Sequence, residues 1–313
     1  MPVNKSEQAF FEELAKVPQG KPVGELSLQE FRQLSDVFNQ YTGDAAAVNY
    51  RDLQIPVSDG SKLQVRLYNH DMDNAPILVF YPGNGYVINL FEANCIACSR
   101  IADYSKVKVA VVNFRRAPEH PLPQPIHDCL DCTKYLVAHS KQFAIDRDKI
   151  FIGGISSGAH AAAVISNWVR NDADLPIKRQ ILVNGSYDST FSYHEFDEYE
   201  NEDLLCLPES IDYLMKNWGV ASDQWSDPAI SPALETNFEN LPKTTILVGE
   251  YDRVRNHSEL YFKRLKAANV DVEKITLQGQ THNTMLLRSV MSDGPDPSKV
   301  IADIINRDSK CGI

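Results

Sequence analysis

Residues 149–168 read KIFIGGISSGAHAAAVISNW, and this stretch decides the fold. The pattern of a short apolar strand at 149–153 runs into the pentapeptide GISSG at 154–158, and an alanine-rich helical pattern follows directly. In a G-x-S-x-G turn between strand and helix, the serine sits in a strained conformation where side chains two positions away would collide, which explains the glycines. The helix N-terminus then directs free backbone amides to where negative charge develops. A plain turn of small residues is the competing interpretation, but this context makes Ser156 the candidate nucleophile.

A serine hydroxyl becomes nucleophilic only when a base takes its proton, so an acid and a histidine are expected downstream, in that order. Asp252 follows the apolar stretch TTILVGE, and His282 follows VEKITLQG. Both positions are ends of expected strands, on the same sheet edge as Ser156. The sequence therefore predicts that His282 takes the proton of Ser156 and returns it to the leaving group, while Asp252 fixes the tautomer of His282 and stabilises its imidazolium.

Acyl transfer also needs donors for an oxyanion. After the apolar stretch PILVFY comes the loop PGNGY at residues 82–86, in the place where such enzymes supply backbone amides. The amide of Ser157 would complete the hole. A simple turn is the alternative interpretation of this loop.

The alternation of apolar segments predicts an α/β fold. Residues 1–45 have helical periodicity, with a second helical segment at 27–41, and the turn Asp59-Gly60-Ser61 predicts a hairpin. Strands are expected at residues 48–57, 63–68, 76–81, 108–114, 150–153, 180–184, 244–248 and 272–277. Helices between the later six imply an eight-stranded, mostly parallel sheet with an antiparallel start and helices on both faces.

One segment interrupts the alternation. Residues 186–232 are too long for an ordinary loop, are rich in aromatic and acidic residues, and contain an expected helix at 210–218. We therefore expect an N-terminal helical cap segment at 1–45 and a catalytic domain at 46–313 with an inserted cap at about 186–232. The cap carries six acids between Glu195 and Asp203, for which a solvated face is favoured over recognition of a cationic substrate.

Composition excludes several other classes of protein. The 313 residues are 43% hydrophobic and 23% charged, which excludes a disordered chain. A net charge of −11 disfavours nucleic acid as a partner, and no apolar stretch approaches the length of a membrane span. Glu7, Glu12 and Glu13 lie where a Sec signal peptide needs an uninterrupted apolar region, so a cytoplasmic location is expected, or export by a route that the sequence does not reveal.

The cysteines and remaining histidines give weaker signals. Cys95 with Cys98 and Cys129 with Cys132 form two CxxC pairs, for which buried thiols on helix faces are favoured over a four-thiolate zinc site. Cys311 could be an exposed thiol. His160 is expected to be packed, and since the other histidines lack metal-ligand spacing, no metal is assigned.

Six motifs together resemble one family. They are PGNGYV, NFRRAPEHPLP, GISSGAHAAA, SDPAISP, GEYDRVR and THNT, and they look like the hormone-sensitive-lipase-like branch of the α/β-hydrolases, the bacterial type IV lipolytic esterases. The APEHP segment at 117–121 is the most specific marker. The resemblance implies the α/β-hydrolase fold with a helical cap, and hydrolysis of short to medium acyl esters of small molecules without a cofactor.

The sequence also departs from the family. The usual HGGG loop is Pro82-Gly83-Asn84-Gly85, in which Asn84 and Gly85 occupy the positions of the amide donors; an Asn keeps its N–H and tolerates positive φ. Ile155 replaces an Asp, and Asn283-Thr284 replaces Gly-Phe. No triad residue is lost, so altered specificity or rate is expected rather than inactivity.

Two other functions are compatible with the sequence. A selective amidase, formamidase or deacetylase would keep the triad, and the altered loop favours such a narrower substrate. A ligand-binding descendant without turnover is the non-enzyme alternative. A homodimer that pairs the edge strand at 272–277 is a further expectation.

Overall fold

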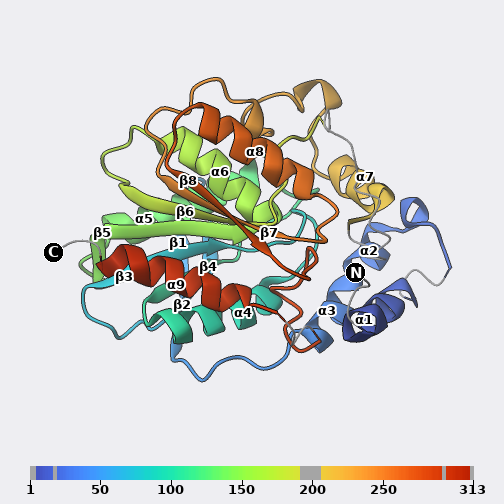
Figure 1. Cartoon of the computed structure of the whole chain (residues 1–313), viewed down its shortest axis with the longest axis horizontal. Coiled ribbons are helices and arrows are strands. Elements are labelled where there is room, and N and C mark those ends of the chain that lie inside the picture. The colour runs from blue at the N-terminus through green and yellow to red at the C-terminus, as the bar shows by residue number, and fades with distance from the viewer. Residues whose placement is uncertain (1–4, 17–19, 191–205, 291–293, 311–313) are drawn as a thin grey trace.

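A twisted sheet of eight strands runs through the centre of the molecule (Figure 1). The computed structural model describes residues 5–16, 20–190, 206–290 and 294–310. The strands are β1 (Tyr50–Pro56), β2 (Lys62–Tyr68), β3 (Ala75–Tyr81), β4 (Lys108–Val112), β5 (Ile145–Ile155), β6 (Ile177–Val183), β7 (Lys243–Gly249) and β8 (Val272–Leu277).

The strands follow the order β1-β2-β4-β3-β5-β6-β7-β8. β1 pairs with β2 and β2 with β4 in antiparallel fashion, and every other neighbouring pair is parallel. The predicted mostly parallel sheet with an antiparallel start is therefore confirmed. Central β4 is buried along its whole length whereas β1 is mostly exposed, which explains the continuous apolar run of the first and the alternation of the second.

Strand β5 is longer than predicted. It begins at Ile145 rather than at residue 150, because Ile145 already pairs with Ala75 of β3 before a register shift. Residues 146–149 are all polar, so the hydrophobic pattern of the sequence does not indicate this extension.

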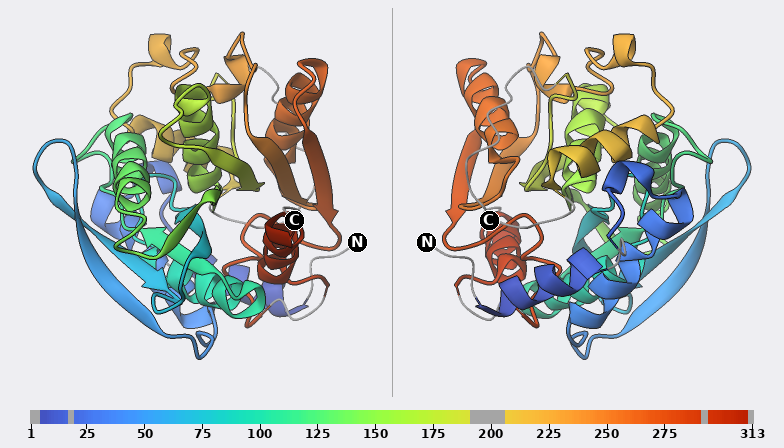
Figure 2. Two further views of the ribbon diagram at one scale, coloured as in Figure 1. Left: turned by 90° about the vertical axis from the view of Figure 1, so that its left-hand side faces the viewer. Right: turned by 90° about the vertical axis from the view of Figure 1, so that its right-hand side faces the viewer.

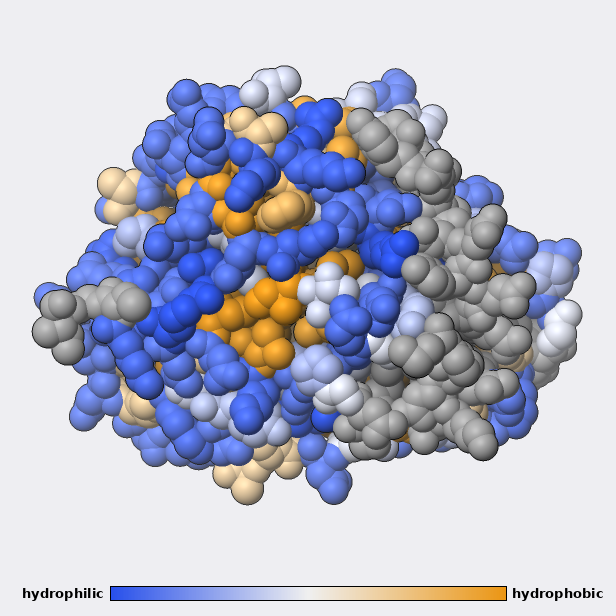
Figure 3. Space-filling view, in the orientation of Figure 1, coloured by the Kyte–Doolittle hydropathy of each residue, from blue (hydrophilic) through white to orange (hydrophobic). Residues whose placement is uncertain are grey.

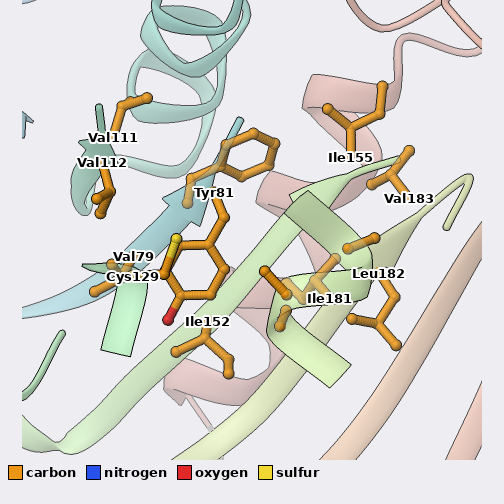
Figure 4. Close-up of a cluster of buried hydrophobic side chains, with 14 of the residues drawn as sticks. Val79, Tyr81, Val111, Val112, Cys129, Ile152, Ile155, Ile181, Leu182 and Val183 are labelled. Carbon is orange, nitrogen blue, oxygen red and sulfur yellow. The ribbon is translucent and has the colours of Figure 1, made fainter. Parts of the chain in front are cut away.

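Helices cover both faces of the sheet (Figure 2). α4 (Phe91–Ser105) and α9 (Pro297–Lys310) pack together on one face, and α5 (Gln124–Ala138), α6 (Ser157–Val169) and α8 (Arg255–Ala267) lie on the other. Figure 4 shows part of the core, in which Tyr81 of β3 lies beside Cys129 of α5. Buried aliphatic side chains of β3, β5 and β6 contribute to this core.

The CxxC pairs lie on opposite faces of the sheet. Cys95 and Cys98 are on α4, whereas Cys129 and Cys132 are on α5, and all four are buried, unbridged thiols. Two helices separated by a sheet cannot converge on one ion, so the alternative of a four-thiolate zinc site is wrong. Burial raises the pKa of each of these thiols, which keeps them protonated and inert.

The N-terminal helices gather at one end of the molecule with α7 (Pro208–Lys216), the helix expected at 210–218 (Figure 1). They are α1 (Lys5–Lys16), the short η1 (Val23–Glu25), α2 (Leu28–Arg32) and α3 (Leu34–Tyr41). The helix expected at 27–41 is thus two helices that meet at Gln33. Phe31 of α2 stacks on Tyr213 of α7 at 4.4 Å between ring centroids, so the two parts of the expected cap are in contact. The acidic segment from Glu195 to Asp203 lies outside the described residues, as does Cys311.

The APEHP segment joins both parts of the expected cap to the sheet domain. The Arg32 guanidinium donates to both carboxylate oxygens of Glu119, at 2.7 and 2.6 Å, and to Ala117 O at 3.0 Å. This contact lowers the pKa of Glu119 to about 2. Directly after this segment, the Leu122 N–H donates to Trp218 O at 2.9 Å. The division at residues 45 and 46 remains a prediction, and these contacts support the N-terminal helices as part of the cap.

Among the described residues, no helix combines the length and the apolar character that a membrane span requires.

Candidate active site

Ser156 occupies a tight turn between β5 and α6. Its backbone angles are φ 55° and ψ −120°, a conformation that is strained for a residue with a side chain. A Cβ on Gly158 would lie 1.8 Å from Tyr81 O, and a Cβ on Gly154 would lie 2.4 Å from the carbonyl carbon of Gly158. Only glycine fits at either position, which confirms the steric reason that the sequence suggested for the motif. The strained turn holds Ser156 out into a pocket.

The three predicted triad residues come together at the carboxyl ends of their strands. His282 Nε2 lies 2.9 Å from Ser156 Oγ, and His282 Nδ1 lies 2.9 Å from Asp252 Oδ1. Asp252 is fully buried and also accepts the Val254 N–H at 3.0 Å through Oδ1. Because a carboxylate only accepts hydrogen bonds, Nδ1 carries the proton and Nε2 presents its lone pair to the serine hydroxyl. The ring is therefore arranged as a base toward Ser156.

Backbone hydrogen bonds tie the two loops that carry Asp252 and His282. Glu250 N–H donates to Leu277 O at 3.0 Å, and Tyr251 N–H donates to Gln280 O at 2.8 Å. Thr284 closes the histidine loop, since its hydroxyl accepts the Thr281 N–H at 3.0 Å and donates to Thr281 O at 3.1 Å. The departure from the family pattern at Thr284 thus has a local structural role.

Asn184 is a buried residue that sequence reasoning missed. It follows β6, and its side chain donates to His282 O at 2.7 Å while accepting the Gly249 N–H at 2.8 Å. One side chain thereby joins the ends of three strands and fixes the backbone of His282. Its only sequence signal is a polar residue at a strand end, which many loops share.

The loop of residues 82–86 lies beside Ser156. Positive φ occurs at Gly85 and Tyr86, at 57° and 63°, and not at Asn84, so tolerance of positive φ is not why Asn occupies its position. The Gly85 carbonyl accepts the Trp218 indole N–H at 2.9 Å, which ties the loop to the end of α7. Among the described residues, neither the Gly85 N–H nor the Ser157 N–H donates a hydrogen bond. Both amides are therefore available to an oxyanion.

Asn84 and Ser157 bind each other in both directions. The Asn84 N–H donates to Ser157 Oγ at 3.0 Å, and the Ser157 hydroxyl donates to Asn84 Oδ1 at 3.2 Å. Asn84 Oδ1 also accepts the Tyr86 N–H at 2.9 Å. The Asn84 amide would reach an oxyanion only by giving up its bond to Ser157.

Two pockets adjoin Ser156 and His282. The first spans about 550 Å³ of empty space and the second about 420 Å³, and both figures include space open to solvent. Gly85, Ser156, Cys206, Leu214 and His282 line both. The other apolar residues that line the first pocket include Tyr86, Ile211, Trp218 and Val254. Those that line the second include Ile88, Leu90, Ile155 and Leu286. Two pockets with mostly apolar walls beside Ser156 suit a substrate with two apolar arms.

His160 is packed beneath the first pocket, as expected. Its Nε2–H donates to Ile230 O at 2.7 Å, and Nδ1 lies 2.6 Å from the Tyr86 hydroxyl. Burial lowers the pKa of His160 to about 4. The ring is therefore neutral at neutral pH and supports the pocket wall.

The low pKa of His160 predicts a loss of stability in acid. Because the unfolded side chain has its ordinary pKa of 6.5, acid protonates the unfolded state first and favours it. The free energy of unfolding should rise between about pH 4 and pH 6.5, by up to about 3 kcal/mol from this residue alone. Urea unfolding of the wild type and of His160→Gln across this range measures the difference between their free energies of unfolding. This difference should widen as the pH rises. Free energies that change in parallel with pH would contradict a lowered pKa of His160.

Comparison with known proteins agrees with this geometry. Residues 78–286 match a family described as the alpha/beta hydrolase fold. The chain is 24% identical over 261 residues to an ethyl acetate hydrolase of Pseudomonas putida, covering 82% of each chain. It is 30% identical over 215 residues to the esterase LipI of Mycobacterium tuberculosis, covering 68% of this chain and 66% of LipI. A hyperthermophilic esterase from the archaeon Pyrobaculum calidifontis superposes with a TM-score of 0.88 at 23% identity over 99% of both chains, which shows a shared fold.

Proposed function

The chain belongs to the α/β-hydrolase family, in its hormone-sensitive-lipase-like branch, and from that premise we propose how its own residues hydrolyse carboxylic esters. It is a carboxylesterase-type serine hydrolase. The observation that carries the mechanism is the chain of hydrogen bonds from Ser156 through His282 to the buried Asp252.

Acylation begins at Ser156. Its Oγ attacks the ester carbonyl carbon while His282 Nε2 takes the hydroxyl proton, and Asp252 stabilises the imidazolium through Nδ1–H. His282 then gives that proton to the leaving alcohol, and the acyl-enzyme remains. Water, deprotonated by the same nitrogen, attacks the acyl carbon and releases the acid and free Ser156. Neither half-reaction as written requires a cofactor.

The oxyanion is stabilised by the amides of Gly85 and Ser157. Neither N–H donates a hydrogen bond among the described residues, and both residues line the first pocket together with Ser156. Each donor of this kind contributes about 2.7–4 kcal/mol to the transition state. The mutual bonds of Asn84 and Ser157 support the proposal, because they hold the loop and the helix start at a fixed separation. Asn84 joins as a third donor only if its amide leaves Ser157.

The Asn84–Ser157 pair predicts non-additive effects on catalysis. Ser157→Ala removes both mutual bonds, whereas Asn84→Gly removes only the bond from the Ser157 hydroxyl to Asn84 Oδ1, because glycine keeps the backbone N–H. Each variant should lower kcat/KM by about fivefold to tenfold, which corresponds to the loss of about one net hydrogen bond. The double variant should lose less than the product of the two single losses, because both substitutions remove the same bond from the Ser157 hydroxyl to Asn84 Oδ1. A double variant whose loss equals the product of the two single losses would show that the pair is not a unit.

Short to medium acyl esters are the proposed substrates. The two pockets have room for an acyl arm in one and an alcohol arm in the other. Hydrolysis of p-nitrophenyl esters of increasing acyl length tests this, and kcat/KM should peak at a short to medium chain. Turnover of amides or N-formyl compounds far faster than that of any ester would favour the selective amidase instead, and tight binding without turnover would favour a receptor.

Two further expectations remain predictions. We propose a cytoplasmic location, which cell fractionation tests. A homodimer is supported by β8, which pairs only with β7 in the described part of the sheet. Figure 3 shows apolar side chains exposed on this face, between β8 and α9. Light scattering of the purified protein measures the mass in solution.

A further inference from the structure

Cys206 stands inside the active site, where the triad does not use it. It is buried and lines both pockets together with Ser156 and His282. Metal-ligating atoms of Cys206, Asp252 and His282 all lie within 4.8 Å of one another, and this is the one such cluster found among the described residues. These residues are far apart in the chain, so sequence spacing could not have revealed the cluster.

We propose that Cys206, His282 and Asp252 form a site for a soft divalent cation such as Zn²⁺, and that occupation of this site inactivates the enzyme. Thiolate, imidazole and carboxylate are the three side-chain ligands that zinc takes in proteins. Three protein ligands with water in the fourth position form a usual zinc arrangement. A thiolate ligand selects zinc-like ions over Mg²⁺ and Ca²⁺, which prefer oxygen ligands alone.

Asp252 supplies a second, independent observation. Its Oδ1 accepts from His282 and Val254, but its buried Oδ2 has no hydrogen-bond partner among the described residues. A buried carboxylate oxygen without a partner is unfavourable, and a bound cation would satisfy it. The triad thus presents an acceptor that the hydrolytic mechanism leaves unused.

The geometry requires only a small contraction. With zinc–ligand bonds of about 2.0–2.3 Å, tetrahedral ligands lie roughly 3.5 Å apart, about 1 Å closer than the limit that the cluster already meets. Rotation of the Cys206 and His282 side chains can supply such a movement. Binding releases the thiol proton and engages the imidazole, so His282 can no longer accept a proton from Ser156.

Zn²⁺ titration tests the site. In reductant-free buffer, a slight molar excess of Zn²⁺ over enzyme should abolish ester hydrolysis, EDTA should restore it, and the same concentration of Mg²⁺ should have no effect. In Cys206→Ser, the concentration that halves the variant's own uninhibited rate should rise by at least about tenfold. The matched control is Cys98→Ala, which removes a buried thiol on α4 and should leave the inhibition unchanged.

Binding of Co²⁺ is measured without reference to activity. Wild-type protein should show thiolate-to-cobalt charge-transfer absorption that saturates at one equivalent, and Cys206→Ser should lack it. Inhibition that is equal in wild type and Cys206→Ser, or Co²⁺ bound without a thiolate band, would overturn the proposal. The inhibition assay rests on the proposed esterase activity, whereas the cobalt spectrum does not. A protein that binds Co²⁺ through the thiolate but hydrolyses no ester would contradict the esterase function and leave the metal site intact. An active esterase without the thiolate band would contradict the metal site alone.

Discussion

Replacing Ser156 with alanine is expected to lower kcat for ester hydrolysis by about 10⁶-fold, to the background rate. The variant lacks the oxygen that lies 2.9 Å from His282 Nε2, so no acyl-enzyme can form. The folded state should survive, because the deleted hydroxyl packs against the open pocket rather than the core. Initial rates with a p-nitrophenyl ester, measured beside the melting temperature, give the result.

The matched control is Ser222→Ala, which deletes an exposed hydroxyl in the short helix η3 (Ser222–Gln224). Its kcat should equal that of the wild type. If Ser156→Ala, folded as judged by its melting curve, kept more than a small fraction of wild-type activity, another nucleophile would have to be found.

Replacing Asp252 with asparagine is expected to lower kcat by about 10⁴-fold. An asparagine keeps the size of the side chain and can still accept the Val254 N–H, but it cannot stabilise the imidazolium and allows the wrong tautomer of His282. Because the loss falls on the chemical step, KM should change far less than kcat. Steady-state kinetics at several substrate concentrations separate the two parameters.

Asp303→Asn on α9 is the control, since this exposed residue lies far from the pockets and its loss of charge should leave kcat unchanged. An Asp252→Asn variant within tenfold of wild type would assign the orienting role to another residue.

The sequence predicted the parts of this site that follow from local rules. A G-x-S-x-G turn between strand and helix needs no tertiary information, because the steric conflict that selects its glycines arises within a few residues and one neighbouring strand. The positions of Asp252 and His282 followed from parallel topology, which brings the carboxyl ends of successive strands to one edge. Parallel order was in turn predictable from apolar runs separated by helices.

The contacts between distant segments could not be predicted. Asn184 reaches the backbone of His282 across 98 residues of chain, and the Asn84–Ser157 bonds span 73 residues. Cys206 enters the pocket from the inserted segment, where its neighbours in the sequence give no indication of the triad. The start of β5 was missed for a different reason, since its first residues are polar although they continue the strand.

Covalent labelling with an organophosphonate ester, followed by intact-mass and peptide mass spectrometry, tests directly whether Ser156 is the nucleophile. A nucleophilic Ser156, activated by His282 and placed beside free amides, should give one adduct per chain that maps to Ser156, with parallel loss of activity. Ser156→Ala should take up none. A folded wild-type protein that forms no adduct, or carries it on another residue, would contradict the account.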